Sequence, residues 1–349
     1  MNRSVMPWVM PWEGVPHERT WVAWPTDGYS LGESSEEIES VRRAWAAVAN
    51  AVAEFEPVTV IVDPRDVEVA APYLDEGITL KVTPLNDAWV RDMGPTFVVS
   101  QPDAAGKRRL GAVNWIFNGW GAQEWAEWDK DEKVAATVAG WAGAELIDSP
   151  IVNEGGGIHV DGEGTVLVTE TVQLDPGRNP GKTHGDIEAE LRRTLGVSKV
   201  IWLPRGLTRD YQEFGTRGHV DIVATFARPG VVLVHDQENP EHPDYGVSQQ
   251  TVDLLQEQTD AAGRELEIVR VPAPATLRDD RGWVDYSYIN HLVVNGGVVA
   301  CSFNDSNDDR AAEILAQAYP GRRVVTVDAR SIFAGGGGIH CITQQQPSV

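Results

Sequence analysis

The chain has 349 residues, of which 42% are apolar and 23% are charged, values typical of a globular protein with a core. Its formal net charge of −23 argues against nucleic acid as a partner, because phosphate binding needs clustered basic residues. No run approaches the roughly 18 apolar residues of a membrane span, and the start MNRS does not resemble a secretory signal. Two cysteines make no disulfide scaffold, so we expect a reduced, cytoplasmic protein.

Five short apolar runs rich in β-branched residues recur along the chain. They are residues 20–24 (TWVAW), 96–100 (TFVVS), 165–169 (TVLVT), 231–235 (VVLVH) and 298–302 (VVACS). The intervals between their first residues are 76, 69, 66 and 67. Such a period predicts repeated supersecondary units. Continuous apolar runs of this kind also predict strands that are buried on both faces, so Cys301 is expected in the core.

Helices and further strands are expected between these runs. The clearest helix spans residues 35–55, where apolar residues recur every three or four positions and Ser34 or Ser35 is a suitable N-cap. Other helices are expected at residues 123–141, 187–195, 247–262 and 308–319, and strands at 58–62, 200–203, 266–271 and 324–327. The alternation favours one α/β domain over residues 1–349, made of about five modules around an axis. The alternative is a two-domain doubly wound protein, but no Gly-X-Gly-X-X-Gly turn opens a helix after an early strand.

A glycine-rich pattern occurs three times. Residues 335–341 read GGGGIHC, residues 154–161 read EGGGIHVD and residues 216–221 read TRGHVD. Glycine runs of this kind are typical of unusual backbone angles or of a backbone close to a ligand. The thiol of Cys341 follows one run, where nearby backbone N–H groups favour a thiolate. We interpret the three segments as one structural unit that presents a different polar side chain each time.

Carboxylates accompany these segments. Residues 86–95 (NDAWVRDMGP) place Asp92 near the aromatic Trp89, a combination suited to a flat cation, although a charged surface loop is the alternative. Glu154 precedes a glycine turn. His219 and Asp221 have the spacing of side chains on one side of an extended strand, so they could act together.

Other catalytic classes lack their motifs. The sequence has no Cys-X-X-Cys, no helical His-X-X-X-His and no zinc-deaminase signature, and it has no Gly-X-Ser-X-Gly nucleophile elbow. A loop cysteine with histidine and carboxylates elsewhere in the chain remains, which is the pattern of thiolate nucleophilic catalysis.

These segments together resemble the agmatine deiminase family, within the bacterial peptidyl-arginine deiminase group of guanidine-modifying enzymes. The start of the chain fits too, with MPWE at residues 10–13 and HERTW at residues 17–21. The resemblance implies a single-domain five-bladed α/β propeller, the pentein fold. It implies Cys341 as nucleophile, His219 as general acid and base, and Asp92 and Asp221 as guanidinium clamps.

Further roles follow from the same resemblance. Glu154 is implied as another active-site carboxylate, Trp89 as a lining of the substrate channel, and Gly338 as a substrate-binding residue. The sequence departs from the family pattern at residues 26–31, at Arg217, where a small polar or acidic residue is usual, and at Ile222, where asparagine is usual. Agmatine itself is therefore a weaker inference than guanidine chemistry.

The reaction implied is hydrolysis of agmatine to N-carbamoylputrescine and ammonia through a covalent thiouronium, with no metal or organic cofactor. Alternatives are deimination of another guanidine (free or peptidyl arginine, or a guanidino acid), an amidinotransferase that uses the same intermediate, and a binding protein without activity. The expected partners are a small cationic guanidine and, if the protein assembles, a second copy of the chain as a homodimer. Neither nucleic acid nor a membrane is expected.

Overall fold

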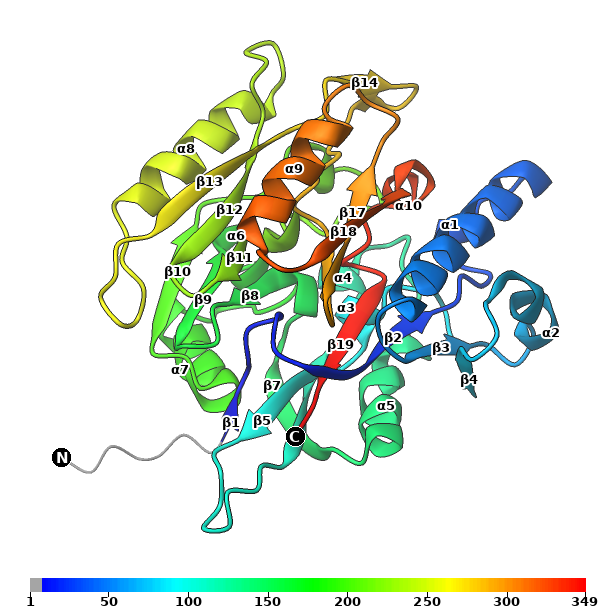
Figure 1. Ribbon diagram of the computed structural model, residues 1–349, viewed down its shortest axis with the longest axis horizontal. Helices are drawn as coiled ribbons and strands as arrows, with labels where there is room; N and C mark the ends of the chain where they lie inside the picture. The colour runs from blue at the N-terminus through cyan, green and yellow to red at the C-terminus, as the bar shows by residue number, and fades with distance from the viewer. Residues whose placement is uncertain (1–7) are drawn as a thin grey trace.

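Five sheets of three or four strands form the framework of residues 8–349, which are the residues that the computed structural model describes (Figure 1). The expectation of no secretory signal concerns residues 1–4, which lie outside them. Each sheet contains an antiparallel strand pair, then a helix, then a third strand parallel to the second. The first unit consists of β19 (Thr343–Pro347), β2 (His17–Ala23), α1 (Ser35–Ala53) and β3 (Val58–Val62), and the second of β5 (Thr96–Ser100), β6 (Leu110–Ile116), α5 (Val134–Ala142) and β7 (Glu145–Val152). The third unit consists of β8 (Ile158–Val160), β9 (Thr165–Thr169), α7 (His184–Leu195) and β10 (Lys199–Leu203), and the fourth of β11 (Ala224–Arg228), β12 (Val231–Asp236), α8 (Asp244–Gln256) and β13 (Glu267–Pro272). The fifth unit consists of β16 (Leu292–Val294), β17 (Gly297–Ser302), α9 (Asp308–Ala318) and β18 (Arg323–Asp328).

Smaller elements extend or connect these units. The added strands are β1 (Trp8–Val9), β4 (Thr79–Val82), and the β14 (Arg278–Asp279) and β15 (Gly282–Trp283) hairpin. The short helices are α2 (Val67–Ala70), α3 (Val90–Met93), α4 (Gly119–Ala122), α6 (Glu170–Gln173) and α10 (Arg330–Ala334). The 3₁₀ turns are η1 (Tyr29–Leu31), η2 (Ala71–Tyr73), η3 (Asp131–Lys133), η4 (Gly155–Gly157), η5 (Arg209–Tyr211) and η6 (Val220–Ile222). None of the helices in residues 8–349 is long and apolar enough to cross a membrane.

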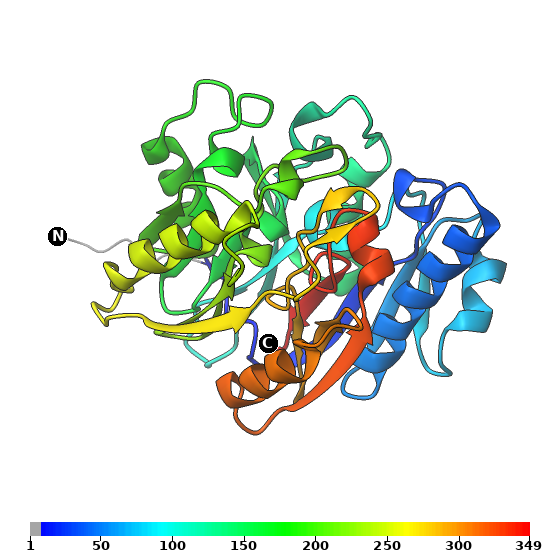
Figure 2. The same cartoon turned by 90° about the horizontal axis from the view of Figure 1, so that it is seen from above.

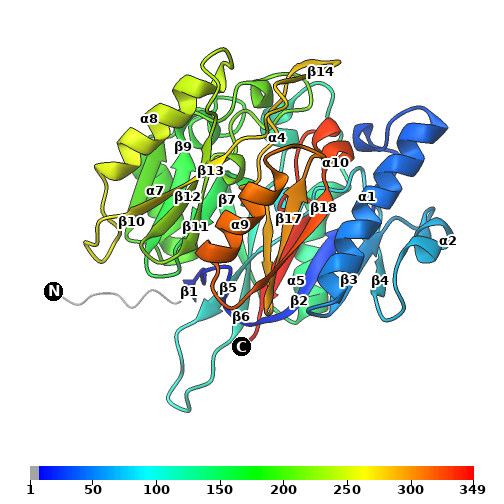
Figure 3. The same cartoon turned by 45° about the horizontal axis from the view of Figure 1, so that its top comes forward.

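The C-terminal strand completes the first sheet. β19 pairs antiparallel with β2, with Thr343 opposite Val22, so a strand from near each end of the described chain lies beside the other (Figure 3). This pairing holds Cys341, which lies two residues before β19, against the N-terminal part of the chain.

Helix α1 follows the expected pattern. The Ser34 hydroxyl accepts the backbone N–H of Glu37 while the Glu37 carboxylate accepts the backbone N–H of Ser34, a capping box that fixes the start of the helix. Its apolar stripe, which includes Val41, Trp45 and Val48, is buried. Viewed from above, α1 (blue), α8 (yellow-green) and α9 (orange) lie on the outside of the molecule and cover the strands (Figure 2).

All five apolar runs are found in strands, but one does not occupy the same place in its unit. Four lie in the second strand, whereas residues 96–100 form β5, the first strand of theirs. The second strand of that unit is β6, where Gly111 and Asn114 interrupt the β-branched pattern. The first two intervals therefore do not measure the structural repeat. Cys301 is buried in β17, as expected.

Two helix predictions were too long. Of residues 123–141, only those from Val134 onward belong to α5, because the Trp125 ring instead packs in a loop, 4.4 Å from the ring of Tyr29. The helix predicted to residue 262 ends at Gln256. Beyond it the Asp260 carboxylate accepts the backbone N–H groups of Ala262 and Arg264, which closes a turn instead of another helical turn.

Candidate active site

Six polar side chains from five separate loops meet at one buried place. Each loop lies directly before the first strand of a unit, so the repeat itself brings these distant segments together. The six residues, each less than a tenth exposed, are Asp92, Glu154, His219, Asp221, Asn290 and Cys341.

Gly156 leaves a small space among them. A Cβ added there would lie 2.5 Å from His219 Nδ1, 3.0 Å from Asp92 Oδ1 and 3.1 Å from Asp221 Oδ2. Within residues 8–349, His219 Nδ1 and Asp221 Oδ1 have no hydrogen-bond partner although both are buried. Buried polar atoms are normally paired, so these two are placed to bind a polar group held over Gly156.

The thiol of Cys341 borders this space. Asn290 Nδ2 donates to Sγ at 3.3 Å, and Asp221 Oδ2 lies 3.5 Å from Sγ. The backbone of Gly337 packs against both the sulfur and the ring of Trp89, because a Cβ on it would lie 3.0 Å from Sγ and 2.7 Å from the indole. The glycine run thus allows close packing behind the nucleophile.

The electrostatics around the sulfur favour the thiol over the thiolate. Burial, and then the carboxylates of Asp221 and Asp92, raise the pKa of Cys341 well above its ordinary value. The backbone of Gly338 and the side chain of Asn290 act in the opposite direction but do not compensate. The backbone of the glycine turn thus acts in the expected direction, toward the thiolate, but burial and the two carboxylates outweigh it without a bound cation.

His219 lies between two carboxylates. Its Nε2 is 3.3 Å from Glu154 Oε2 and its Nδ1 is 3.8 Å from Asp92 Oδ1. Burial alone would lower its pKa, but Asp92 and Glu154 raise the pKa of His219 to about 9. The ring is thus an imidazolium at neutral pH. The extended geometry expected for this segment is wrong, because η6 (Val220–Ile222) is a 3₁₀ turn, and this turn is what carries Asp221 to the site.

Asp92 is held by two donors. The indole Nε1 of Trp120 donates to Oδ2 at 2.8 Å, and the backbone N–H of Gly156 donates to Oδ1 at 3.1 Å. Burial raises the pKa of Asp92 to about 6, although the His219 cation lowers it. Trp120 lies in α4 (Gly119–Ala122), where all four residues have positive φ. A left-handed turn costs about 1–2 kcal/mol per non-glycine residue, and such strain is typical of functional positions.

A buried arginine fixes Glu154. Arg178 Nε lies 2.9 Å from Glu154 Oε1, its Nη1 lies 2.8 Å from Asp175 Oδ2, and its Nη2 donates to the carbonyl of Thr216 at 2.6 Å. Although burial opposes it, Arg178 lowers the pKa of Glu154, which stays ionised beside His219. Arg217, one of the departures from the family pattern, also faces Asp175, at 3.3 Å.

A series of buried charged side chains holds Asp221 in place. His340 Nδ1 is 2.8 Å from Asp221 Oδ2, and His340 Nε2 is 2.9 Å from Glu13 Oε1, which comes from a position 327 residues away. Glu13 also faces Arg91 at 3.5 Å and His159 at 3.7 Å. Burial and Arg91 oppose protonation of His340, but Glu13 and Asp221 raise its pKa. The positive His340 therefore lies between the negative Asp221 and Glu13.

Three of these groups also have the spacing of metal ligands. Atoms of Glu13, His159 and His340 lie within 4.8 Å of one another. Hydrogen bonds account for the same atoms, because both nitrogens of His340 face carboxylates and His159 Nδ1 accepts the backbone N–H of Phe226 at 3.1 Å. That bond places the proton of a neutral His159 on Nε2, which then points toward Glu13 as a donor and not as a metal ligand.

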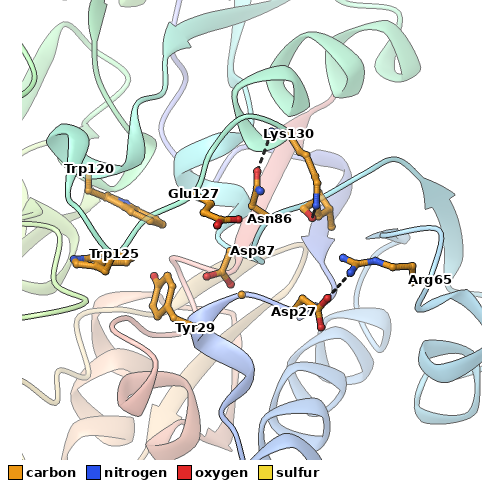
Figure 4. Close-up of a pocket in the computed structure, with 11 residues that line it drawn as sticks. Asp27, Tyr29, Arg65, Asn86, Asp87, Trp120, Trp125, Glu127 and Lys130 are labelled. Carbon is orange, nitrogen blue, oxygen red and sulfur yellow. Dashed lines mark hydrogen bonds and ion pairs between the residues drawn. The ribbon is translucent and has the colours of Figure 1, made fainter.

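A cavity of about 310 Å³ opens beside this site (Figure 4). Trp120 belongs to both, since its ring lines the cavity and its Nε1 bonds Asp92. The cavity therefore adjoins the buried polar cluster. Other side chains on its wall are Tyr29, Asp87, Trp125, Glu127 and Lys130.

Comparison with known proteins assigns the chain to a family. The sequence profile of the Porphyromonas-type peptidyl-arginine deiminase family matches residues 9–347. The chain belongs to this family. A relative from Streptomyces coelicolor is 56% identical over 97% of this chain and 98% of its own length. The agmatine deiminase of Ectopseudomonas mendocina is 40% identical over 97% of this chain and 95% of its own.

A solved structure agrees with this assignment. The agmatine deiminase of Enterococcus faecalis superimposes with a TM-score of 0.90 at 33% identity, covering 98% of this chain and 96% of that one. The single-domain α/β architecture is thus that of an agmatine deiminase in the peptidyl-arginine deiminase family.

The structure brings together the residues selected by their likeness to this family. The five proposed catalytic residues lie among the six of the cluster, and the alternative of a charged surface loop for residues 86–95 is wrong because Asp92 and Trp89 are buried. The ring of Trp89 packs behind the sulfur. Gly338 is required for packing, because a Cβ on it would lie 2.4 Å from Asn290 Oδ1.

Sequence reasoning missed four contributors, namely Asn290, Trp120, Arg178 and the pair of Glu13 with His340. Asn290 could have been found, because residues 290–291 (NH) precede an apolar strand as the other site residues do. Trp120 lies in the left-handed turn α4 and Arg178 lies in a turn after α6, and neither segment contains a comparable sequence repeat. Glu13 was noted only as part of the motif at residues 10–13.

Proposed function

We propose that this protein is an agmatine deiminase, which hydrolyses agmatine to N-carbamoylputrescine and ammonia. The observation that carries the proposal is the space over Gly156, where a thiol, an imidazolium and two carboxylates meet. This set fits a planar guanidinium, since carboxylates can each accept two of its N–H groups. Membership in the family and the activity named for two similar proteins support the same reaction.

Binding is the first step. The guanidinium lies over Gly156 between Asp92 and Asp221, with its carbon facing Cys341 Sγ. A bound cation counteracts the two carboxylates that raise the thiol pKa, so the substrate itself promotes the thiolate. The thiol proton passes to solvent, because His219 is already protonated. Fixing the plane of the guanidinium relative to the sulfur replaces a bimolecular encounter by an oriented approach.

Attack on carbon follows. The Cys341 thiolate forms a C–S bond, and the guanidinium π electrons move onto nitrogen to give a tetrahedral adduct. The His219 imidazolium donates its proton to one NH₂ group, which leaves as ammonia when the C–N bond breaks. A thiouronium on Cys341 and a neutral His219 remain. Glu154, held by Arg178, keeps the imidazole oriented throughout.

Water completes the reaction. Neutral His219 removes a proton from a water molecule as its oxygen attacks the thiouronium carbon. Collapse of this second adduct breaks the C–S bond and releases the ureido product together with the remaining proton of the attacking water, which the released ammonia takes up. The thiolate and the imidazolium are thereby restored. The net change consumes one guanidinium and one water and yields one urea and one ammonium ion.

The test is a quench experiment on the native chain with agmatine. We expect ammonia release without any added amine and an adduct mass on the peptide that contains Cys341. An adduct on another residue would refute the assignment of Cys341 as the nucleophile. Ammonia release that requires a second amine would instead indicate an amidinotransferase.

The proposal also includes the arrangement of the five sheets and the cell compartment of the protein. The five sheets, each with its own helix crossover, would be the blades of a five-bladed propeller, with the site loops converging at its centre. Both cysteines are buried and free, which fits a reducing compartment such as the cytoplasm.

A further inference from the structure

Asp87 is a buried carboxylate that the mechanism above does not use. Its side chain lies on the wall of the cavity in Figure 4, and only 4% of the residue is exposed. Oδ1 accepts the backbone N–H of Ala88 at 2.8 Å, and donors on Ser30 and Trp89 lie close enough to oppose the effect of burial on the pKa of this carboxyl. Oδ2 nevertheless makes no hydrogen bond of normal geometry in the described part of the chain. A buried acceptor without a partner is costly and indicates a ligand group that completes it.

Aromatic rings form the other side of the cavity. The ring centroids of Trp120 and Trp125 are 5.4 Å apart with the planes nearly parallel, and Tyr29 meets Trp125 edge-on at 4.4 Å. Phe214 stacks on Tyr29 at 4.9 Å. A carboxylate opposite aromatic faces is the chemistry that recognises an alkyl ammonium ion, because the rings attract the cation and pack on its methylene groups.

The cavity connects to the guanidinium site through shared residues. Asp87 and Asp92 lie at the two ends of one six-residue segment. Burial raises the pKa of the Tyr29 phenol, and both carboxylates lie close enough to raise it further. Trp120 lines the cavity and bonds Asp92. The guanidinium site and the cavity thus share the ring of Trp120 as a common wall.

We propose that this cavity binds the ammonium end of the substrate and that Asp87 is the residue that selects a guanidine with an amine tail over one with an uncharged or carboxylate tail. This inference rests on the proposed function and adds its specificity determinant. Arginine would place a carboxylate near Asp87, whose repulsion disfavours it, whereas agmatine carries only the ammonium.

The other charged groups on the cavity wall are already engaged or exposed. Arg65 pairs with Asp63 and Asp27, and Lys130 Nζ donates to the carbonyl of Leu85 at 3.2 Å. Glu127 is exposed to solvent. Asp87 is therefore the buried carboxylate of this wall that retains a free oxygen.

The charge of Asp87 makes the selectivity depend on pH. Burial raises the pKa of Asp87 to about 7. Its carboxylate binds the ammonium and its neutral acid does not, so preference for agmatine should rise with pH through about 7. The titratable and charged groups around it are Asp27, Tyr29, Arg65, Asp92, Glu127, Lys130 and Asp131.

The experiment compares agmatine with butylguanidine, which lacks the ammonium. In Asp87→Asn we expect kcat/KM for agmatine to fall about 100-fold, mainly through KM because the contact is equal in ground and transition states. Turnover of butylguanidine should change less than about threefold, which also reports that the variant is folded. Glu124→Gln, which removes a charge from an exposed residue just before Trp125 that does not line the cavity, is the matched control and should leave both substrates within about threefold.

Every other result of this experiment would contradict either the role of Asp87 or the proposed function. Equal loss for both substrates in Asp87→Asn, or no loss for agmatine, would overturn the proposal while leaving the deiminase intact. If the native protein turns over no guanidine, the proposed function itself fails. The native protein gives a test that needs no variant, since the ratio of kcat/KM for agmatine to that for butylguanidine should rise as pH increases from about 6 to about 8. A ratio that does not change with pH would contradict the role of Asp87.

Discussion

The site around Cys341 and the cavity beside Asp87 adjoin each other but are built differently. Around Cys341 the carboxylates are neutralised by buried cations, with His219 between Asp92 and Glu154, and His340 between Asp221 and Glu13. In the cavity, Asp87 faces aromatic rings with no buried cation bonded to it.

The difference indicates that reaction and selection are separate. Paired charges in a low-dielectric interior hold the reacting groups in one geometry. The reaction at the guanidinium carbon needs this geometry whatever tail the substrate carries. A half-open aromatic cavity with one unneutralised acid adds affinity for one kind of tail and can change without disturbing the reaction. The four variants below test this division from the largest expected effect to the smallest.

Cys341→Ala should abolish turnover of agmatine and of butylguanidine alike, by at least about 10⁴-fold in kcat. Binding should persist because both clamps remain, and calorimetric titration with agmatine can measure it. Cys301→Ser is the matched control, since its Sγ only donates to the Asn290 carbonyl at 3.0 Å and a hydroxyl can do the same. Substantial activity remaining in Cys341→Ala would show that Cys341 is not the nucleophile.

Asp92→Asn should reduce kcat/KM for both substrates several hundred-fold, by about 4 kcal/mol, because it breaks a buried charge pair with the guanidinium. Steady-state kinetics on the two guanidines measure it. A near-normal variant, together with an Asp87→Asn variant that loses both substrates, would reverse the roles of the two regions.

Glu13→Gln should lower kcat by about 30-fold for both substrates, since a small displacement transmitted to the reacting groups can cost up to about 100-fold. Its amide would leave His340 with one carboxylate partner, so Asp221 would lose its fixed support. Glu56→Gln removes the similar buried pair with His17, whose other ring nitrogen bonds the backbone carbonyl of Glu13 and not its carboxylate, and this variant should retain activity when thermal unfolding shows it folded. Equal losses in the two variants would make the Glu13 effect a matter of stability.

Trp120→Phe should lower kcat/KM roughly tenfold, because a hydrogen bond to a charged group contributes about 1.5 kcal/mol at the lower end. The ring still lines the cavity, so the preference for agmatine over butylguanidine should not change. If the preference collapses while butylguanidine is unaffected, Trp120 belongs to the cavity alone, and the boundary between the two regions must be moved.

Sequence patterns predicted the repeated parts well and the irregular parts poorly. The strand runs and helix α1 have local causes, namely β-branched residues in buried strands and a capping box at Ser34, and both were found. The first part of the helix expected at residues 123–141 did not form, because the ring of Trp125 packs on Tyr29 and Trp120, a contact that no local pattern reveals.

By itself, the sequence determined that three glycine-rich segments and the loop at residues 86–95 present a thiol, a histidine and carboxylates, because glycine and polar residues directly before a strand leave a local signature. Only the tertiary structure decided which groups neutralise one another and which acid stays unpaired. Charge pairing depends on contacts such as Glu13 with His340, whose partners are hundreds of residues apart. Such contacts exist only after the sheets have brought their loops together.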